Sequence, residues 1–95
     1  NITEEIRLRY IMAHPARFMI STLLADKKMC ASEIAKKIGI DEKLVRYHLL
    51  TLLRYGLVTG DYNMHEKGKL VKYYTLTEKG KQLLTRIRST STCSS

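Results

Sequence analysis

The chain has 95 residues, of which 44% are hydrophobic, 17 are basic and 9 are acidic, so its net charge is +8. This length predicts one small domain with a single core. No apolar run approaches the roughly 18 to 20 residues of a membrane span, and no signal-peptide core stands near the start, so we expect a cytoplasmic protein with no membrane partner. The basic excess favours a polyanionic partner, because neutralising phosphates releases condensed counterions.

Two helices are predicted in the N-terminal part of the chain. The first covers residues 3–13 and begins near Thr3, whose hydroxyl can cap it. Its apolar residues occupy more than one face, which we interpret as a second packing surface in a homodimer. Pro15 suits the first position of the next helix, which we expect to end near residues 26–27. His14 is expected to pack or to cap that helix instead of binding a ligand.

Two further helical patterns predict a helix-turn-helix within residues 30–58. The first pattern runs to Gly39, and the second runs over residues 41–56. Asp41 is a good N-cap, because its carboxylate can accept from free amides of the first turn. Ile40 and Val45 have the spacing of a hydrophobic staple. The second helix also carries apolar residues at intervals of three and four, the period of one buried face.

The opposite face of that second helix is basic. A basic helix held out by a preceding helix suits the major groove of DNA, whereas the alternative is a solvated face of a surface helix. Leu50 lies on this basic face and either touches a thymine methyl or is covered by another segment. The candidate DNA-contacting residues of this helix are Glu42, Lys43, Arg46, Tyr47, Leu50 and Arg54.

A β-hairpin follows the helix-turn-helix. Residues 57–63 and 69–76 have strand character, and the charged, glycine-containing segment 65–69 marks the turn. We interpret residues 57–76 as a wing whose lysines contact phosphates or enter a minor groove; the alternative is an unspecific, solubilising loop. The candidate DNA-contacting residues of the wing are His65, Lys67, Lys69 and Lys72.

The last predicted helix covers residues 77–88. Thr77 is its expected cap, and Gly80 weakens its start by up to about 1 kcal/mol relative to alanine. Residues 89–95 show no apolar periodicity, so we expect a disordered tail after a domain of residues 1–88.

Several of these segments resemble ArsR-like (arsenical-resistance repressor type) winged-helix regulators. The run 31–58 resembles their DNA-binding core, His14 to Arg17 resembles their His-Pro-x-Arg motif, and residues 73–77 resemble the second wing strand leading into the last helix. The resemblance covers roughly residues 10–85. It implies a mainly α fold with a small β-hairpin wing (α+β), a winged helix-turn-helix in which Tyr74 and Leu76 point inward.

The resemblance also suggests that the first helix, residues 3–13, pairs with the last helix, residues 77–88, to complete a dimer face. The candidate dimer residues are Ile6, Tyr10, Leu83 and Ile87. Ser32 and Lys36, in the first motif helix, are candidates for contacts to the DNA backbone.

No catalytic, cofactor or metal site is readable, so we expect no enzyme, no cofactor and no metal. The three histidines lie in different segments, without cysteine or carboxylate partners at metal-ligand spacing. Metal-sensing members of the family carry a cysteine pair in the first motif helix, or carboxylate and histidine ligands in the last. This chain has only Cys30 in the former region and no histidine in the latter. Cys30 has either a structural role or the role of a reactive thiol, and His48 is expected to be half-buried.

We therefore hypothesise a sequence-specific transcriptional regulator that binds double-stranded DNA as a homodimer. Helix 41–55 would read the major groove of an inverted repeat, and wing residues 64–70 would contact the backbone or the minor groove. The effector is not readable from the sequence. The alternative is a winged-helix interaction module of a larger assembly that binds protein without specific DNA binding.

Overall fold

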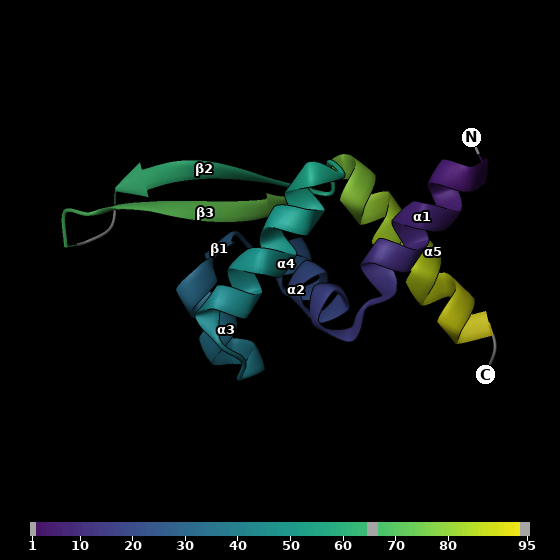
Figure 1. Ribbon diagram of the computed structural model, residues 1–95, viewed down its shortest axis with the longest axis horizontal. Coiled ribbons are helices and arrows are strands. Elements are labelled where there is room, and N and C mark those ends of the chain that lie inside the picture. Colours follow the sequence, from purple (N-terminus) through teal and green to yellow (C-terminus); the bar gives the residue numbers. More distant parts are fainter. Residues whose placement is uncertain (1, 65–66, 94–95) are drawn as a thin grey trace.

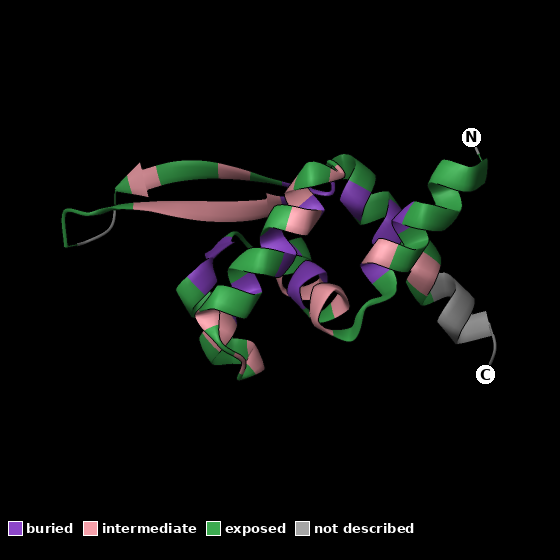
Figure 2. Cartoon of the chain, in the orientation of Figure 1, coloured by how far each residue is buried: buried purple, intermediate pink, exposed green. Residues whose placement is uncertain are grey.

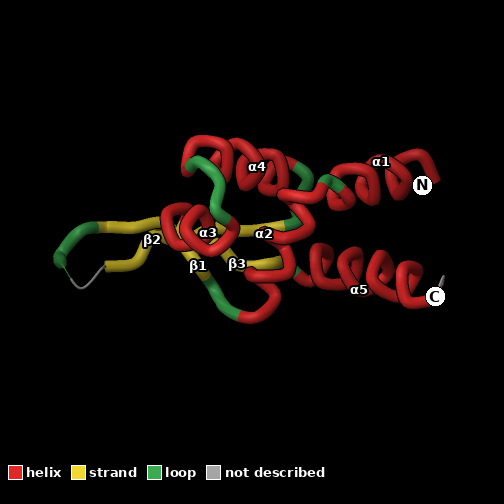
Figure 3. The backbone as a smooth tube through the Cα atoms, turned by 90° about the horizontal axis from the view of Figure 1, so that it is seen from below, coloured by secondary structure: helices red, strands yellow, loops and turns green. Residues whose placement is uncertain are grey.

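The structure is a computed structural model that describes residues 2–64 and 67–93. The wing lies at one end of the molecule, and both termini lie at the other end (Figure 1, Figure 3). In chain order the elements are α1 (Ile2–Ala13), α2 (Pro15–Asp26), β1 (Met29–Cys30), α3 (Ala31–Ile38), α4 (Glu42–Arg54), β2 (Val58–Met64), β3 (Leu70–Leu76) and α5 (Glu78–Cys93).

The three strands form an antiparallel sheet in the order β1-β3-β2. The hairpin runs from the pair Val58 and Leu76 at its base to the pair Met64 and Leu70 beside the turn. This confirms the predicted wing to within a residue at each end. Strand β1 was not predicted, because two residues are too few to show alternation; it pairs with Tyr73 and Tyr74 of β3. Through β1 the start of α3 is hydrogen-bonded to the wing.

One apolar core joins the helices to the base of the hairpin. Figure 2 shows buried residues at the centre of the molecule and exposed residues on the outer wing and the outward side of α4. Burial of each core side chain stabilises the fold by roughly 1.5 to 3 kcal/mol. Because Val45, Leu49 and Leu52 of α4 are among these side chains, the core fixes how α4 is oriented. The fully buried residues at its centre are Met12, Ile20, Ile34, Val45, Leu49, Leu52 and Leu57.

Local capping explains the bounds of α2 and α3. His14 caps α2, since its Nδ1 accepts from the Ala16 amide at 3.2 Å, and Pro15 follows at the first helical position as predicted. Cys30 occupies the N-cap of α3, and its amide donates to the Glu33 carboxylate at 3.1 Å. At the other end, Gly39 adopts a left-handed conformation with φ 83°.

Helix α4 begins and ends as its sequence predicts. The Asp41 carboxylate accepts from the Lys43 amide at 3.1 Å, which confirms the N-cap. At the C-terminus Gly56 has φ 72°, and its amide donates to the Leu53 carbonyl at 3.0 Å. The Leu57 amide donates to the Leu52 carbonyl at 2.9 Å, which completes a Schellman motif. The chain is thus turned out of the helix directly into the wing.

Two predicted helix bounds are wrong. Helix α1 already includes Ile2, so Thr3 lies inside the helix instead of capping it. Helix α5 continues to Cys93, so the tail predicted to be disordered is helical over residues 89–93; residues 94–95 lie outside the described part. Serine and threonine cost only tenths of a kcal/mol each in a helix, and extending an existing helix adds a hydrogen bond for each residue, so the lack of apolar periodicity did not end α5.

The start of α5 is attached to the end of α4. The Thr77 hydroxyl accepts from the Gly80 amide at 3.0 Å, which confirms the predicted cap, and also donates to the Gly56 carbonyl at 2.7 Å. The Thr77 amide donates to the Leu57 carbonyl at 3.0 Å. These bonds link the helix-turn-helix to the terminal helix that packs against α1.

Candidate nucleic-acid interface

The outward face of α4 carries the basic residues that the sequence singled out. Lys43, Arg46 and Arg54 are exposed, whereas Val45, Leu49 and Leu52 on the other side are buried in the core. Tyr47 and Leu50 are also exposed. The helix therefore presents three cationic side chains and one phenol beside the aliphatic Leu50, and its buried face holds this set in place.

Arg46 is held by a neighbour on its own helix. Its guanidinium forms an ion pair with the Glu42 carboxylate one turn earlier. Both side chains are substantially exposed, so solvent screens the pair and its contribution to stability is small, about 0.3 to 0.5 kcal/mol. Its main effect is to restrict the directions in which the guanidinium points.

Leu50 is 56% exposed, so no described segment of this chain covers it. The sequence left two alternatives for Leu50, contact with a thymine methyl or cover by another segment, and the described part of this monomer supplies no such cover. Leu44, near the start of the same helix, is also exposed and was missed by the sequence reasoning. The signal was present, because Leu44 stands outside the row formed by Val45, Leu49 and Leu52. Leu53 is partly buried against the core.

A groove separates α4 from the wing. Its volume is about 330 Å³, and it also touches the start of α3. Basic side chains from two elements line it, Arg46 from α4 and Lys72 from β3, together with Ser32 from α3. Lys36 is exposed further along α3. The structure thus brings Ser32, Arg46 and Lys72 to one channel although they are far apart in sequence.

Lysines also stand on the wing itself. Lys67 and Lys69 are exposed beside the turn, and His65 lies outside the described residues. The Lys72 ammonium lies 5.7 Å from the centre of the Tyr62 ring and 5.5 Å from that of the Tyr74 ring. These cation–π contacts hold the charge over the inner half of the ribbon. Tyr74 packs against the core and Leu76 is buried, as the family resemblance implied.

Side chains near the N-terminus of α4 point into solvent, whereas His48 in the middle of the helix is buried and hydrogen-bonded to α2. The prediction of a half-buried ring is wrong, because His48 is only 3% exposed. Its Nδ1 accepts from Arg17 Nε at 3.2 Å, and Arg17 also donates to the Ile11 carbonyl at 3.1 Å. This chain of bonds joins α4 to α2 and to the end of α1, which periodicity within one helix cannot show.

Burial lowers the pKa of His48, and the positive charges of His14 and Arg17 lower it further. The His14 ring lies 4.7 Å from the His48 ring, measured between ring centres. The neutral form of His48 is therefore the one that fits the folded protein, since it accepts the Arg17 hydrogen bond.

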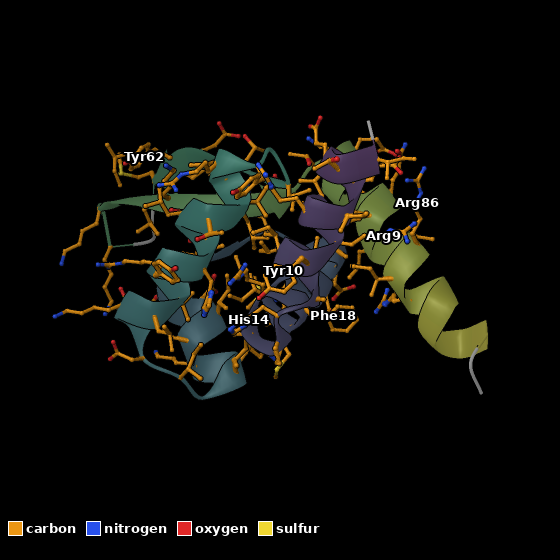
Figure 4. The ribbon with its side chains drawn as sticks, turned by 45° about the vertical axis from the view of Figure 1, so that its right-hand side comes forward. Arg9, Tyr10, His14, Phe18, Tyr62 and Arg86 are labelled. Carbon is orange, nitrogen blue, oxygen red and sulfur yellow. The ribbon has the colours of Figure 1, made fainter. Side chains whose placement is uncertain are left out.

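The predicted dimer residues have different environments. Ile6 and Tyr10 are exposed, Tyr10 by 78%, and Figure 4 shows Tyr10 on α1, far from Tyr62 on the wing. Leu83 is only 7% exposed because it packs in the core of its own chain, so it offers little area to a partner, and its place on the dimer face stays a prediction. Ile87 is partly buried. Helices α1 and α5 do lie side by side (Figure 3).

Within residues 2–64 and 67–93, no three His, Cys, Asp or Glu side chains are grouped so that they could hold a metal ion. Cys30 is a buried free thiol whose Sγ lies 3.3 Å from the Ser32 hydroxyl oxygen. None of the helices in the described part is long and apolar enough to cross a membrane.

Comparison with solved structures places this architecture among bacterial regulators. The chain superposes on diamide-treated YodB from B. subtilis with a TM-score of 0.81 and 22% identity, covering 90% of this chain and 84% of that one. For the transcriptional repressor BigR from Xylella fastidiosa the TM-score is 0.77 and the identity 26%, with 93% and 83% covered. For reduced HlyU from Vibrio cholerae the values are 0.77 and 22%, with 94% and 90% covered.

Sequence comparison points the same way. No curated protein matches the chain significantly. Residues 14–59, which hold α2, β1, α3 and α4, match the family model of the bacterial regulatory proteins of the arsR family. This family and fold are those of transcriptional regulators and not of enzymes. The chain is therefore an ArsR-like winged helix-turn-helix protein, one of the DNA-binding transcriptional regulators.

Proposed function

We propose that this regulator binds a specific inverted repeat as a homodimer in the cytoplasm, with α4 in the major groove and wing residues 64–70 on the backbone or in the minor groove. The observation that carries this proposal is the two-sided character of α4. Its apolar side is locked in the core, and Lys43, Arg46 and Tyr47 project from the other side. A helix presented in this way fits the major groove, where each base pair has its own pattern of donors and acceptors.

Each candidate residue has a role set by its chemistry. Arg46 contacts guanine, because a guanidinium can donate two bonds to O6 and N7. Glu42 orients that guanidinium or accepts from a cytosine amino group, and Leu50 covers a thymine methyl. Lys43 and Tyr47 face bases beside Arg46. The residues that contact the DNA backbone or the minor groove are Ser32, Lys36, Arg54, His65, Lys67, Lys69 and Lys72.

The dimer forms through α1 and the exposed part of α5. Ile2, Ile6 and Tyr10 are exposed at intervals of four and form an apolar row on α1 that the described residues leave uncovered. Ile87 extends the apolar surface on α5. Two-fold symmetry about this face would set the two α4 helices about 34 to 36 Å apart, one turn of DNA.

The test begins with selection of a duplex from randomised DNA, followed by binding measurements at several salt concentrations. Arg46→Lys keeps the charge but lacks the planar fork, so it should lose roughly 1 to 3 kcal/mol on the selected duplex while the salt dependence stays the same. Lys27→Ala, at an exposed position directly after α2 and outside α4, the wing and the proposed dimer helices, serves as the charge-removal control and should bind normally.

Two results would overturn the proposal. One is a wild-type protein with no sequence preference, and the other is an equal loss for Arg46→Lys on selected and scrambled duplexes, which would assign Arg46 to the backbone. A monomer that ignores DNA in sizing chromatography would favour the alternative, an interaction module that binds protein.

A further inference from the structure

One face of the wing hairpin is mainly apolar from its base to its turn, with Lys72 as its charged residue. Residues directly opposite each other in an antiparallel pair point to the same side, and alternate residues along a strand share a face. The register therefore places Met64, Leu70, Tyr62 and Lys72 on one face, continuous with Tyr74 nearer the core. The opposite face carries mostly polar residues such as Asp61 and Asn63.

The inner end of this face is part of the core, but its outer end is not covered. Val58 and Leu76 at the base are buried, whereas Tyr62, Met64 and Leu70 are 67%, 68% and 67% exposed. The wing extends away from the helices, and Figure 4 shows Tyr62 well apart from the α1 end of the molecule. Three large apolar residues that adjoin one another on one surface are characteristic of an interaction site. We call these three residues the apolar wing strip.

We infer that the apolar wing strip enters the minor groove next to the bases read by α4 and unstacks one base step there, so that the protein kinks its DNA. This inference rests on the proposed function, and it names what the wing does beyond contacting phosphates. Proteins that bind the minor groove frequently insert apolar side chains between base steps and bend the duplex by roughly 20 to 90°.

The charges around the strip favour DNA as its occupant. Lys72 lies on the same face, over the Tyr62 ring, and Lys69 stands next to Leu70 in sequence. An apolar surface bordered by ammonium groups suits a groove whose floor is formed by base edges and whose rims are phosphates.

The groove between α4 and the wing supplies the geometry. Leu70 and Lys72 line it on the wing side, and Arg46 lines it on the α4 side. With α4 in the major groove, the neighbouring minor groove lies across one sugar-phosphate strand. That strand can occupy the channel of about 330 Å³, where Arg46 and Lys72 carry complementary charge and the one lining carboxylate, Glu42, is paired with Arg46. Because Leu70 itself lines the channel, the strip begins beside this strand and continues through Met64 and Tyr62 into the minor groove.

This arrangement predicts a sequence preference at positions that no polar side chain reads. Pyrimidine–purine steps such as TA and CA/TG unstack most easily, so the selected duplex should carry one of them beside each half-site. A stiff A-tract at the same position should weaken binding.

The experiment uses the full chain and the duplex selected from randomised DNA, with 2-aminopurine placed at each step next to the half-sites. Wild-type protein should raise the 2-aminopurine fluorescence at one step of each half-site, and a gel assay with the site at different positions should show a bend. The double variant Met64→Ala with Leu70→Ala should abolish both signals and bind the duplex roughly tenfold or more weakly. Roughly tenfold is the affinity ratio that corresponds to burying one such side chain.

Met19→Ala is the matched control, because Met19 is an exposed methionine on α2, away from the wing. It should leave bending, unstacking and affinity unchanged. The strip residues are exposed, so the double variant should keep the thermal stability of the wild type.

Three results would overturn the inference. Sequence-specific binding without unstacking or bending would reject the wedge while the proposed function stands. Unchanged signals in the double variant would show that the strip does not make the kink. A lower oligomeric mass of the double variant in light scattering would assign the strip to contact between copies. Absence of any sequence preference would instead reject the proposed function, and the wedge with it.

Discussion

Gly80→Ala is expected to destabilise the protein, although alanine is the better helix former. Gly80 lies in the first turn of α5, where alanine would normally stabilise a helix by up to about 1 kcal/mol. A Cβ added at Gly80 would lie 2.2 Å from the Leu57 carbonyl oxygen and 2.9 Å from Leu76 Cδ1. The first contact is with backbone, so it cannot be relieved by rotating a side chain.

The size of the effect follows from these two opposing terms. Moving α5 away would strain the hydrogen bond from the Thr77 amide to the same Leu57 carbonyl. Overpacking typically costs about 1 to 3 kcal/mol, and a Cβ 2.2 Å from a backbone oxygen belongs to the upper end, about 2 to 3 kcal/mol. Subtracting up to about 1 kcal/mol gained in helix propensity leaves a net loss of about 1 to 2 kcal/mol. For a domain of this size, each kcal/mol corresponds to roughly 4 to 8 °C in Tm.

Urea unfolding and thermal melts of wild type and Gly80→Ala measure this directly. Gln82→Gly, at an exposed position of the same helix, reports the cost of glycine in α5 without the packing contact. If Gly80→Ala were as stable as the wild type or more stable, the close approach of α5 to Leu57 would be wrong.

Three further predictions concern the core, the dimer face and pH. The folded protein lowers the pKa of His48, so protonation of this imidazole favours the unfolded chain. The contribution of neutral His48 to stability is complete above about pH 6.5, the ordinary pKa of histidine, and is lost as the pH falls from there through the lower folded pKa. His48→Asn keeps an acceptor for Arg17 and should flatten urea-derived stability between pH 7.5 and 5, whereas an unchanged slope would remove His48 as the cause. The Ser21 hydroxyl is buried and has no hydrogen-bond partner among the described residues, so Ser21→Ala should raise the unfolding free energy by about 1 kcal/mol; a loss of stability there would reveal a missing partner. Tyr10→Lys should lower the mass in light scattering to that of a monomer, while Met19→Lys, at another exposed site, should not, and an unchanged mass for Tyr10→Lys would place the dimer face elsewhere.

The helix-turn-helix was predictable because its signals are local. Asp41 and Gly56 act on amides and carbonyls within a few residues, and those contacts form wherever the helix forms. The buried row of Val45, Leu49 and Leu52 has the period of the helix itself. The basic face of α4 follows from that row without any knowledge of the other elements.

Features that depend on distant segments were missed or misjudged. His48 lies deeper than its spacing suggested, because Arg17 of α2 reaches it. Gly80 was interpreted as a weakness of α5, whereas the contact with Leu57 gives the glycine its reason. Leu83 was named as a candidate dimer residue, and the structure buries it in the core of its own chain. In each case the deciding neighbour is more than 20 residues away in sequence or belongs to another element.

The apolar wing strip was missed for a different reason. The alternation of Tyr62 and Met64 with polar residues is typical of a strand with one covered face, and it does not reveal where the covering ends. The structure shows where it ends, because the hairpin extends beyond the core (Figure 1) and Tyr62, Met64 and Leu70 are strongly exposed.

The most direct test of the central claim replaces single guanines of the selected duplex with 7-deazaguanine, which lacks the N7 acceptor in the major groove. If α4 lies there with Arg46 on guanine, wild-type affinity should fall at one guanine in each half-site by roughly 1 to 3 kcal/mol, with the two positions about 10 base pairs apart. Arg46→Ala should show no further loss at those guanines. If no guanine were sensitive, or if the variant lost as much as the wild type, α4 would not read the major groove through Arg46.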